Sequence, residues 1–192
     1  MGAASDYTEK DFDQDCPWNV LNRKDLNPRQ VIYRSLCQLL HPLPDHECQR
    51  VLEELRSLAK VSRQGRATQL SLSPDEILQL AEDGLIEVGA HTMTRPFLSE
   101  LPIDIQHEEV NRNKQQLEEL LGSRVKSFSY PYGSMADYTK GTVRLVQESG
   151  FDYACSNDPG RTNLRTDLFQ LPRFIVRDWD GDDFCRQLIA QF

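Results

Sequence analysis

Short apolar runs that alternate with helical stretches fill the second half of the sequence, and they restrict its fold more than any other feature. The runs lie at residues 85–90, 125–130, 151–155 and 169–176. Apolar residues at helical spacing separate them, for example at Val143 and Val146, and a last helix is expected from about Asp182. Strands joined by helical crossovers form parallel sheets. The pattern therefore predicts an α/β fold with parallel strands.

The first half of the chain has a different pattern, that of two helices separated by a proline-containing break. Apolar residues recur at helical spacing on both sides of this break, which predicts a helical hairpin over residues 28–60. Ser73, Pro74 and Glu76 have the spacing of a helix N-terminal cap, so a short helix is expected there. We therefore divide the chain into an acidic flexible tail, a helical hairpin segment and an α/β domain, at residues 1–15, 16–70 and 71–192.

Charge and hydropathy exclude several classes of partner. The net charge is -8 and the basic residues are scattered, which argues against nucleic acid and against an anionic membrane surface. No apolar run approaches the ~20 residues that span a bilayer. The start of the sequence has no apolar signal-peptide core, so a cytoplasmic location is the default expectation. The five cysteines are widely spaced and form no CxxC pair, which predicts reduced thiols.

Polar and aromatic residues, together with proline and glycine, follow two of the apolar runs at the carboxyl ends of the predicted strands. Parallel α/β sheets bind their ligands at these ends. Residues 91–96 read His-Thr-Met-Thr-Arg-Pro, and residues 130–133 read Tyr-Pro-Tyr-Gly. We expect His91 and Tyr132 to lie at the same end of the sheet.

These two segments, with Gly-Phe-Asp-Tyr-Ala at residues 150–154, resemble the NodB-homology family of polysaccharide deacetylases, carbohydrate esterase family 4. The similarity runs over residues 72–192. It implies a distorted (β/α) barrel, of which this chain would hold a part. It also implies hydrolysis of acetyl groups from N-acetylglucosamine-type polysaccharides, with a carbohydrate polymer as partner and a divalent metal, usually zinc, as cofactor.

The resemblance assigns roles to individual residues. His91 matches a metal-binding histidine, and Tyr132 matches the residue whose backbone N–H stabilises the oxyanion, in a turn that Pro131 fixes. Tyr130, Pro131, Tyr132 and Asp152 are the expected substrate-binding residues. Arg173 occupies the position where many members carry a catalytic acid.

Two departures from the family pattern predict that the site is incomplete. Arg95 stands where the second metal-binding histidine is expected, and a guanidinium has no lone pair for a metal. The family's Thr-Phe-Asp-Asp-Gly segment, which supplies the catalytic base and a further metal ligand, does not occur in this sequence. We therefore expect no bound zinc and no deacetylation by this chain.

Three interpretations remain open at the level of sequence. The chain is part of a longer deacetylase, or a non-catalytic relative that binds carbohydrate or protein, or one part of a barrel that a homo-oligomer completes. The first predicts an Asp-Asp segment upstream of Met1, and the second predicts a purified protein without zinc.

Overall fold

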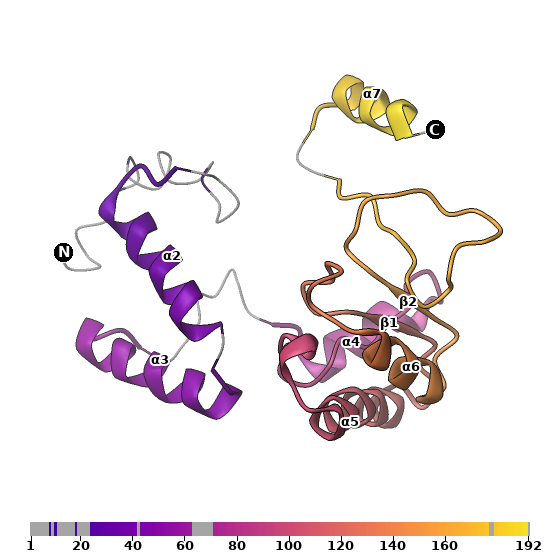
Figure 1. Ribbon diagram of the computed structural model, residues 1–192, viewed down its shortest axis with the longest axis horizontal. Coiled ribbons are helices and arrows are strands. Elements are labelled where there is room, and N and C mark those ends of the chain that lie inside the picture. Colours follow the sequence, from indigo (N-terminus) through magenta and orange to yellow (C-terminus); the bar gives the residue numbers. More distant parts are fainter. Residues whose placement is uncertain are drawn as a thin grey trace. The chain divides into compact units, whose positions relative to one another are not determined.

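The computed structural model describes residues 8, 10, 18, 24–41, 43–62, 71–176 and 179–191. The chain separates into two compact units, Met1–Leu70 and Ser71–Phe192, which are described here one at a time (Figure 1). Most of the acidic tail predicted over residues 1–15 lies outside the described residues.

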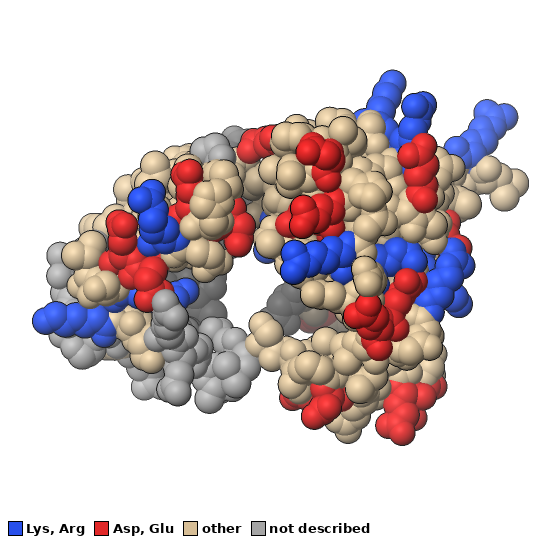
Figure 2. Space-filling view, turned by 90° about the horizontal axis from the view of Figure 1, so that it is seen from below, with Lys and Arg blue, Asp and Glu red and all other residues tan. Residues whose placement is uncertain are grey.

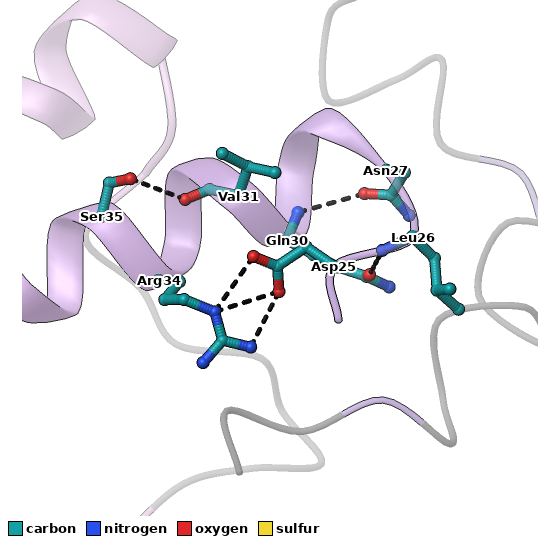
Figure 3. Close-up of polar contacts among 7 residues, drawn as sticks. All are labelled: Asp25, Leu26, Asn27, Gln30, Val31, Arg34 and Ser35. Carbon is teal, nitrogen blue, oxygen red and sulfur yellow. Dashed lines mark hydrogen bonds and ion pairs between the residues drawn. The ribbon is translucent and has the colours of Figure 1, made fainter. Parts of the chain in front are cut away.

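In the part of the first unit that the structure describes, helices α2 (Pro28–Leu40) and α3 (Asp45–Ala59) lie where the sequence pattern predicts them. The start of α2 explains why a helix begins here (Figure 3). The Asn27 side chain accepts a hydrogen bond from the Gln30 N–H at 3.1 Å, and Pro28 occupies the first turn, where no N–H is needed. Lys60 ends α3 in the left-handed conformation.

One ion pair fastens the segment before α2 to the helix (Figure 3). Arg34 donates to both carboxylate oxygens of Asp25, with its Nη2 at 2.8 Å from Oδ1 and its Nε at 3.0 Å from Oδ2. This hydrogen bonding lowers the pKa of Asp25 below its ordinary value. The contact is local and fixes how the chain enters the helix.

The second unit is built on parallel extended segments. Strands β1 (Ser127–Ser129) and β2 (Tyr153–Cys155) pair in parallel, with Phe128 opposite Ala154. Parallel bridges from Ala90 to Phe128 and from Cys155 to Leu171 extend the pairing on both sides. The four apolar runs therefore lie side by side in sequence order, which confirms the predicted α/β class with parallel strands.

Helices α4 (Pro74–Glu82), α5 (Ile103–Leu121) and α6 (Lys140–Glu148) accompany this sheet, with α5 in contact with both α4 and α6. A buried hydrogen bond of 2.7 Å from the Thr142 hydroxyl to the Gln106 side chain joins α6 to α5. The final helix is α7 (Gly181–Gln191). None of the described helices is long and apolar enough to cross a membrane.

The third connection of the sheet differs from the expected alternation of strand and helix. Between β2 and Leu171 the described chain forms turns, not a helix. Residues 156–170 include several Asn, Asp, Pro and Gly residues, which favour turns over helices. Asn163, for example, accepts hydrogen bonds from the N–H groups of Arg165 and Thr166, the latter through its backbone carbonyl.

The core of the second unit lies between the sheet and helices α5 and α6. Buried side chains from the extended segments meet those of the helices, and the largest are Tyr130, Phe128, Leu98, Val110, Val125 and Val146. The rings of Phe128 and Tyr130 contact each other edge to face, with centroids 5.3 Å apart. Because this packing fixes the ends of the strands, the loops that follow them are held in defined positions.

Candidate functional site

A pocket of about 380 Å³ opens at the carboxyl ends of the extended segments. The residues that line it come from the exits of all four segments: His91, Arg95, Ser129, Tyr130, Tyr132, Asn157, Arg173, Phe174 and Ile175. Five of the residues singled out from the sequence thus meet in one place, namely His91, Arg95, Tyr130, Tyr132 and Arg173. The placement agrees with the expectation that His91 and Tyr132 share one end of the sheet.

His91 is half-buried and has one defined ring contact. Its Nδ1 lies 2.6 Å from the carbonyl oxygen of Ser129. A carbonyl only accepts, so Nδ1 carries the proton and Nε2 keeps the lone pair of the neutral ring. Burial lowers the pKa of His91, and the positive charges of Arg95 and Arg173 lower it further, while the Ser129 contact opposes them.

Helix α5 holds the loop that follows Ala90. The Asn113 side chain accepts a hydrogen bond of 2.9 Å from the His91 backbone N–H. One turn away, Glu109 accepts from the backbone N–H groups of Met93 and Thr94, both at 2.9 Å, and from the Thr94 hydroxyl. These two side chains, four residues apart on one face of α5, therefore anchor the loop from His91 to Arg95.

The loop itself is bent by two residues with positive φ. Thr92 has φ 67° and Arg95 has φ 59°, in the left-handed region that costs an ordinary residue about 1–2 kcal/mol. The Arg95 N–H donates to the Thr92 hydroxyl at 3.1 Å, which bridges the bend. Strain of this kind persists only where surrounding contacts hold it, as Glu109 does here.

Tyr132 is the third non-glycine residue with positive φ near the pocket, after Thr92 and Arg95, with φ 59°. Its ring stacks on Phe97, with centroids 3.8 Å apart and an interplanar angle of 4°. The guanidinium of Arg95 lies 4.9 Å from the centre of the same ring. Tyr132 as a whole remains 41% exposed, so the part of its ring that Phe97 and Arg95 leave uncovered forms aromatic surface at the pocket.

The turn beneath Tyr132 is tightly packed. Gly133 has φ 77°, and a Cβ added there would lie 2.9 Å from the Asn157 backbone nitrogen. Asn157 donates from that nitrogen to the Gly133 carbonyl at 2.7 Å, which joins the exits of β1 and β2. Pro131 is buried in this turn and does not line the pocket.

Tyr130 lies deeper, with its ring fully buried. Its hydroxyl donates to the Phe169 carbonyl at 2.9 Å, and its ring stacks on Tyr138 at 4.0 Å. Burial raises the pKa of Tyr130 far above its ordinary value, so the phenol stays protonated. Its part in the site is to form the floor of the pocket.

Arg173 enters the pocket from the segment after Leu171. Its Nε donates to the Ser156 carbonyl at 2.6 Å, and its backbone N–H donates to the Asp158 carbonyl at 3.1 Å. These contacts fix the Arg173 backbone and the Nε end of its guanidinium group. No acidic residue of the described chain forms an ion pair with Arg173. Its Nη1 and Nη2 groups are therefore available to a ligand.

Asp152, expected from the resemblance to bind substrate, lies elsewhere. It precedes β2, and its backbone N–H donates to the Lys126 carbonyl. Its carboxylate pairs with Arg124 at 2.7 Å on the surface. Asp152 is not among the residues that line the pocket.

The side chains at the pocket do not fit a divalent metal ion. His91 offers one nitrogen, and Arg95 and Arg173 offer no lone pair. A protein zinc site normally has at least three protein ligands. Within the described residues, no group of three or more His, Cys, Asp or Glu side chains is placed to hold a metal.

Several residues of the site were not predicted from the sequence. Phe97, Glu109 and Asn113 support the loop and the Tyr132 ring, and Asn157 and Phe174 line the pocket. The four-residue spacing of Glu109 and Asn113 on a predicted helix was the available signal. The contact of Phe97 with Tyr132 joins loops far apart in sequence, so no local pattern indicates it.

Comparisons with known proteins give one family and several solved structures of similar fold. The family model described as polysaccharide deacetylase matches residues 49–154. The Streptococcus pyogenes deacetylase PplD, solved in complex with acetate, is similar with a TM-score of 0.55 and 17% identity, over 62% of this chain and 52% of that chain. IcaB from Ammonifex degensii is 22% identical, over 74% of this chain and 66% of that chain, with a TM-score of 0.49.

A putative polysaccharide deacetylase from Bacillus anthracis is 23% identical, with a TM-score of 0.47, over 54% of this chain and 32% of that chain. At these identities the likeness concerns the fold alone, and this chain spans about half the length of the PplD structure. A search of curated proteins found no significant match.

Proposed function

This chain belongs to the polysaccharide deacetylase family, and on that premise we propose that the pocket lined by His91 and Tyr132 is a carbohydrate-binding site without metal-dependent deacetylase activity of its own. The family is one of metal-dependent hydrolases whose substrates are acetylated polysaccharides. Membership of this family supports a carbohydrate ligand for this chain, whereas the side chains at the pocket do not fit the zinc of the family.

The composition of the pocket supports a sugar ligand. Binding sites for small molecules combine apolar and aromatic surface with a few polar groups that fix orientation. Here the uncovered part of the Tyr132 ring supplies aromatic surface, and Phe174 and Ile175 add apolar surface. The free nitrogen of His91 and the guanidinium groups supply the polar contacts.

The position of Arg95 is the main reason to expect no catalysis by this chain. Metal-assisted hydrolysis uses a cation to polarise a carbonyl and to lower the pKa of a bound water. Arg95 places a permanent positive charge beside His91, where the family's second imidazole would stand, and it repels a cation there. Tyr132 keeps a backbone N–H with no hydrogen-bond partner in the described chain, which fits a donor to a ligand oxygen.

A second candidate follows from the share of the PplD structure that the chain covers, 52%. A further segment, or a second copy of the chain, could complete the barrel and contribute carboxylates. Pairing between copies would cover the sheet edges at Ala90 and Leu171, since unpaired edges are usually protected. In such an assembly Arg95 would still oppose a metal beside His91.

The test combines binding and turnover with one ligand, the N-acetylglucosamine tetramer. We expect NMR shifts at His91 and Tyr132 on titration, and no release of acetate with added zinc. Tyr132→Ala removes this aromatic surface and should weaken binding about tenfold, in the range of aromatic truncations in binding sites. Tyr33→Ala is the matched control, because Tyr33 is exposed on α2 in the first unit. Enzyme-like acetate release that His91→Ala abolishes would contradict the proposal.

A further inference from the structure

Two guanidinium groups line the pocket, and no carboxylate does. This is unexpected for a chain with 30 acidic and 22 basic residues. On the face shown in Figure 2, acidic and basic side chains are interspersed. The pocket therefore differs from this surface in carrying charge of one sign.

Arg95 is positioned by the loop and not by an acidic partner. Its guanidinium contacts the Tyr132 ring, with 4.9 Å to the ring centre, and the residue is exposed. No ion pair between Arg95 and an acidic residue is found in the described chain. A guanidinium has five N–H donors, so the aromatic contact leaves donors for a ligand.

Arg173 is half-buried and approaches the pocket from a different segment. Its Nε is used by the Ser156 carbonyl at 2.6 Å, which orients the guanidinium plane. A guanidinium held at one nitrogen keeps its Nη donors in a fixed geometry, and this reduces the entropy lost on binding a planar anion. Asp158, whose carbonyl holds the Arg173 N–H, does not line the pocket.

We infer that this pocket recognises the carboxylate of an acidic sugar, held between the guanidinium groups of Arg95 and Arg173, with the sugar ring near Tyr132. The inference rests on the proposed carbohydrate site and names its ligand class. Carboxylates match the planar N–H fork of arginine and form strong charge-assisted hydrogen bonds with it. The apolar and aromatic surface of Tyr132, Phe174 and Ile175 at the pocket favours a carboxylate attached to a ring over a small free anion.

The experiment is calorimetric titration of the 192-residue chain with three probes. The first is a tetrasaccharide that alternates glucuronic acid and N-acetylglucosamine, the second is the same compound with its carboxylates reduced to alcohols, and the third is acetate. We expect the acidic tetrasaccharide to bind about tenfold or more tightly than the reduced one, as charge-assisted hydrogen bonds typically give. Acetate should bind more weakly than the acidic tetrasaccharide.

Variants then test whether Arg95 causes the preference for the acidic tetrasaccharide. Arg95→Gln should remove most of the preference for the acidic compound, and Arg95→Lys should restore part of it, because charge returns without the planar fork. Arg144→Gln is the matched control, since Arg144 is an exposed arginine of α6 outside this pocket. Far-ultraviolet circular dichroism checks that each variant is folded.

The outcomes separate this inference from the proposed function. Equal binding of the acidic and reduced tetrasaccharides, unchanged in Arg95→Gln, would overturn the carboxylate while the carbohydrate site stood. Binding of acetate as tight as that of the acidic tetrasaccharide would overturn the sugar ligand. If neither tetrasaccharide bound, both the inference and the proposed function would fail.

Discussion

The guanidinium of Arg95 lies 4.9 Å from the centre of the Tyr132 ring, although the two residues follow different extended segments of the sheet. Both have positive φ, at 59° each, and so both are held in a strained conformation. A contact between two strained residues at the mouth of a pocket indicates that the surrounding structure is arranged to keep them there. Helix α5 and the tight turn at Gly133 provide this support.

The first prediction concerns Glu109, which accepts three hydrogen bonds from Met93 and Thr94. Glu109→Gln replaces one acceptor oxygen by a donor and removes the charge. We expect a loss of about 1–3 kcal/mol in the free energy of unfolding, measured by urea denaturation, and weaker binding at the pocket. Glu108→Gln, at an exposed neighbour that pairs loosely with Arg112, is the control. Equal effects of the two substitutions would contradict the anchoring role.

The second prediction separates strain from crowding at Gly133. Gly133→Ala adds a Cβ at 2.9 Å from the Asn157 nitrogen in a residue with φ 77°. Gly84→Ala meets the same strain, with φ 65°, but nothing lies within 4 Å of its Cβ. We expect Gly84→Ala to cost about 1 kcal/mol and Gly133→Ala distinctly more, in thermal or urea unfolding. If Gly133→Ala destabilised the protein less than Gly84→Ala, the result would contradict the close packing of the residues that follow β1 and β2.

The third prediction concerns pH. The hydrogen bond from Lys114 lowers the pKa of Glu118 below 4.5, burial opposes this, and the Val125 N–H lowers it further. A group with a lowered folded-state pKa contributes stability above its unfolded pKa, and this stability is lost as the pH falls through the folded value. The urea midpoint of the wild type should therefore exceed that of Glu118→Gln near pH 7, and the two should converge as the pH falls below 4.5, the ordinary pKa of this carboxyl.

Glu119→Gln is the control for this pH series, since Glu119 is the exposed neighbour on α5. If the urea midpoints of the wild type and Glu118→Gln differed by the same amount at every pH, the carboxylate charge of Glu118 would not contribute to stability.

The fourth prediction concerns metal content. Only His91 offers a ligand nitrogen at the pocket, and Arg95→His would raise the number to two, still below the three that protein zinc sites normally use. We expect neither the wild type nor Arg95→His to retain stoichiometric zinc in elemental analysis after gel filtration. One zinc per wild-type chain, lost in His91→Ala, would contradict the account of the site.

The parallel sheet could be predicted from the sequence because each strand is an apolar run bounded by polar residues. The capping box at Ser73 and Glu76, with hydrogen bonds in both directions, could be predicted because it is local. The turns between β2 and Leu171 could not be told from a further helix by alternation alone. Their turn-forming residues were the better guide.

The site could be predicted in part. His91, Tyr132 and Arg173 follow apolar runs, and the parallel sheet brings such positions together at one edge. Asp152 precedes its strand and so lies away from the pocket, paired with Arg124. Phe97 and Glu109 act through contacts between separate loops and helices, and such contacts depend on the packed structure.

The most direct test of the account is calorimetric titration of the 192-residue chain with the N-acetylglucosamine tetramer, once with excess chelator and once with added zinc. The account predicts saturable binding at one site per chain in both conditions, with affinities equal within about threefold and with binding about tenfold weaker in Tyr132→Ala. Binding that appears only when zinc is present would contradict it, because the pocket would then hold the metal that Arg95 is expected to exclude.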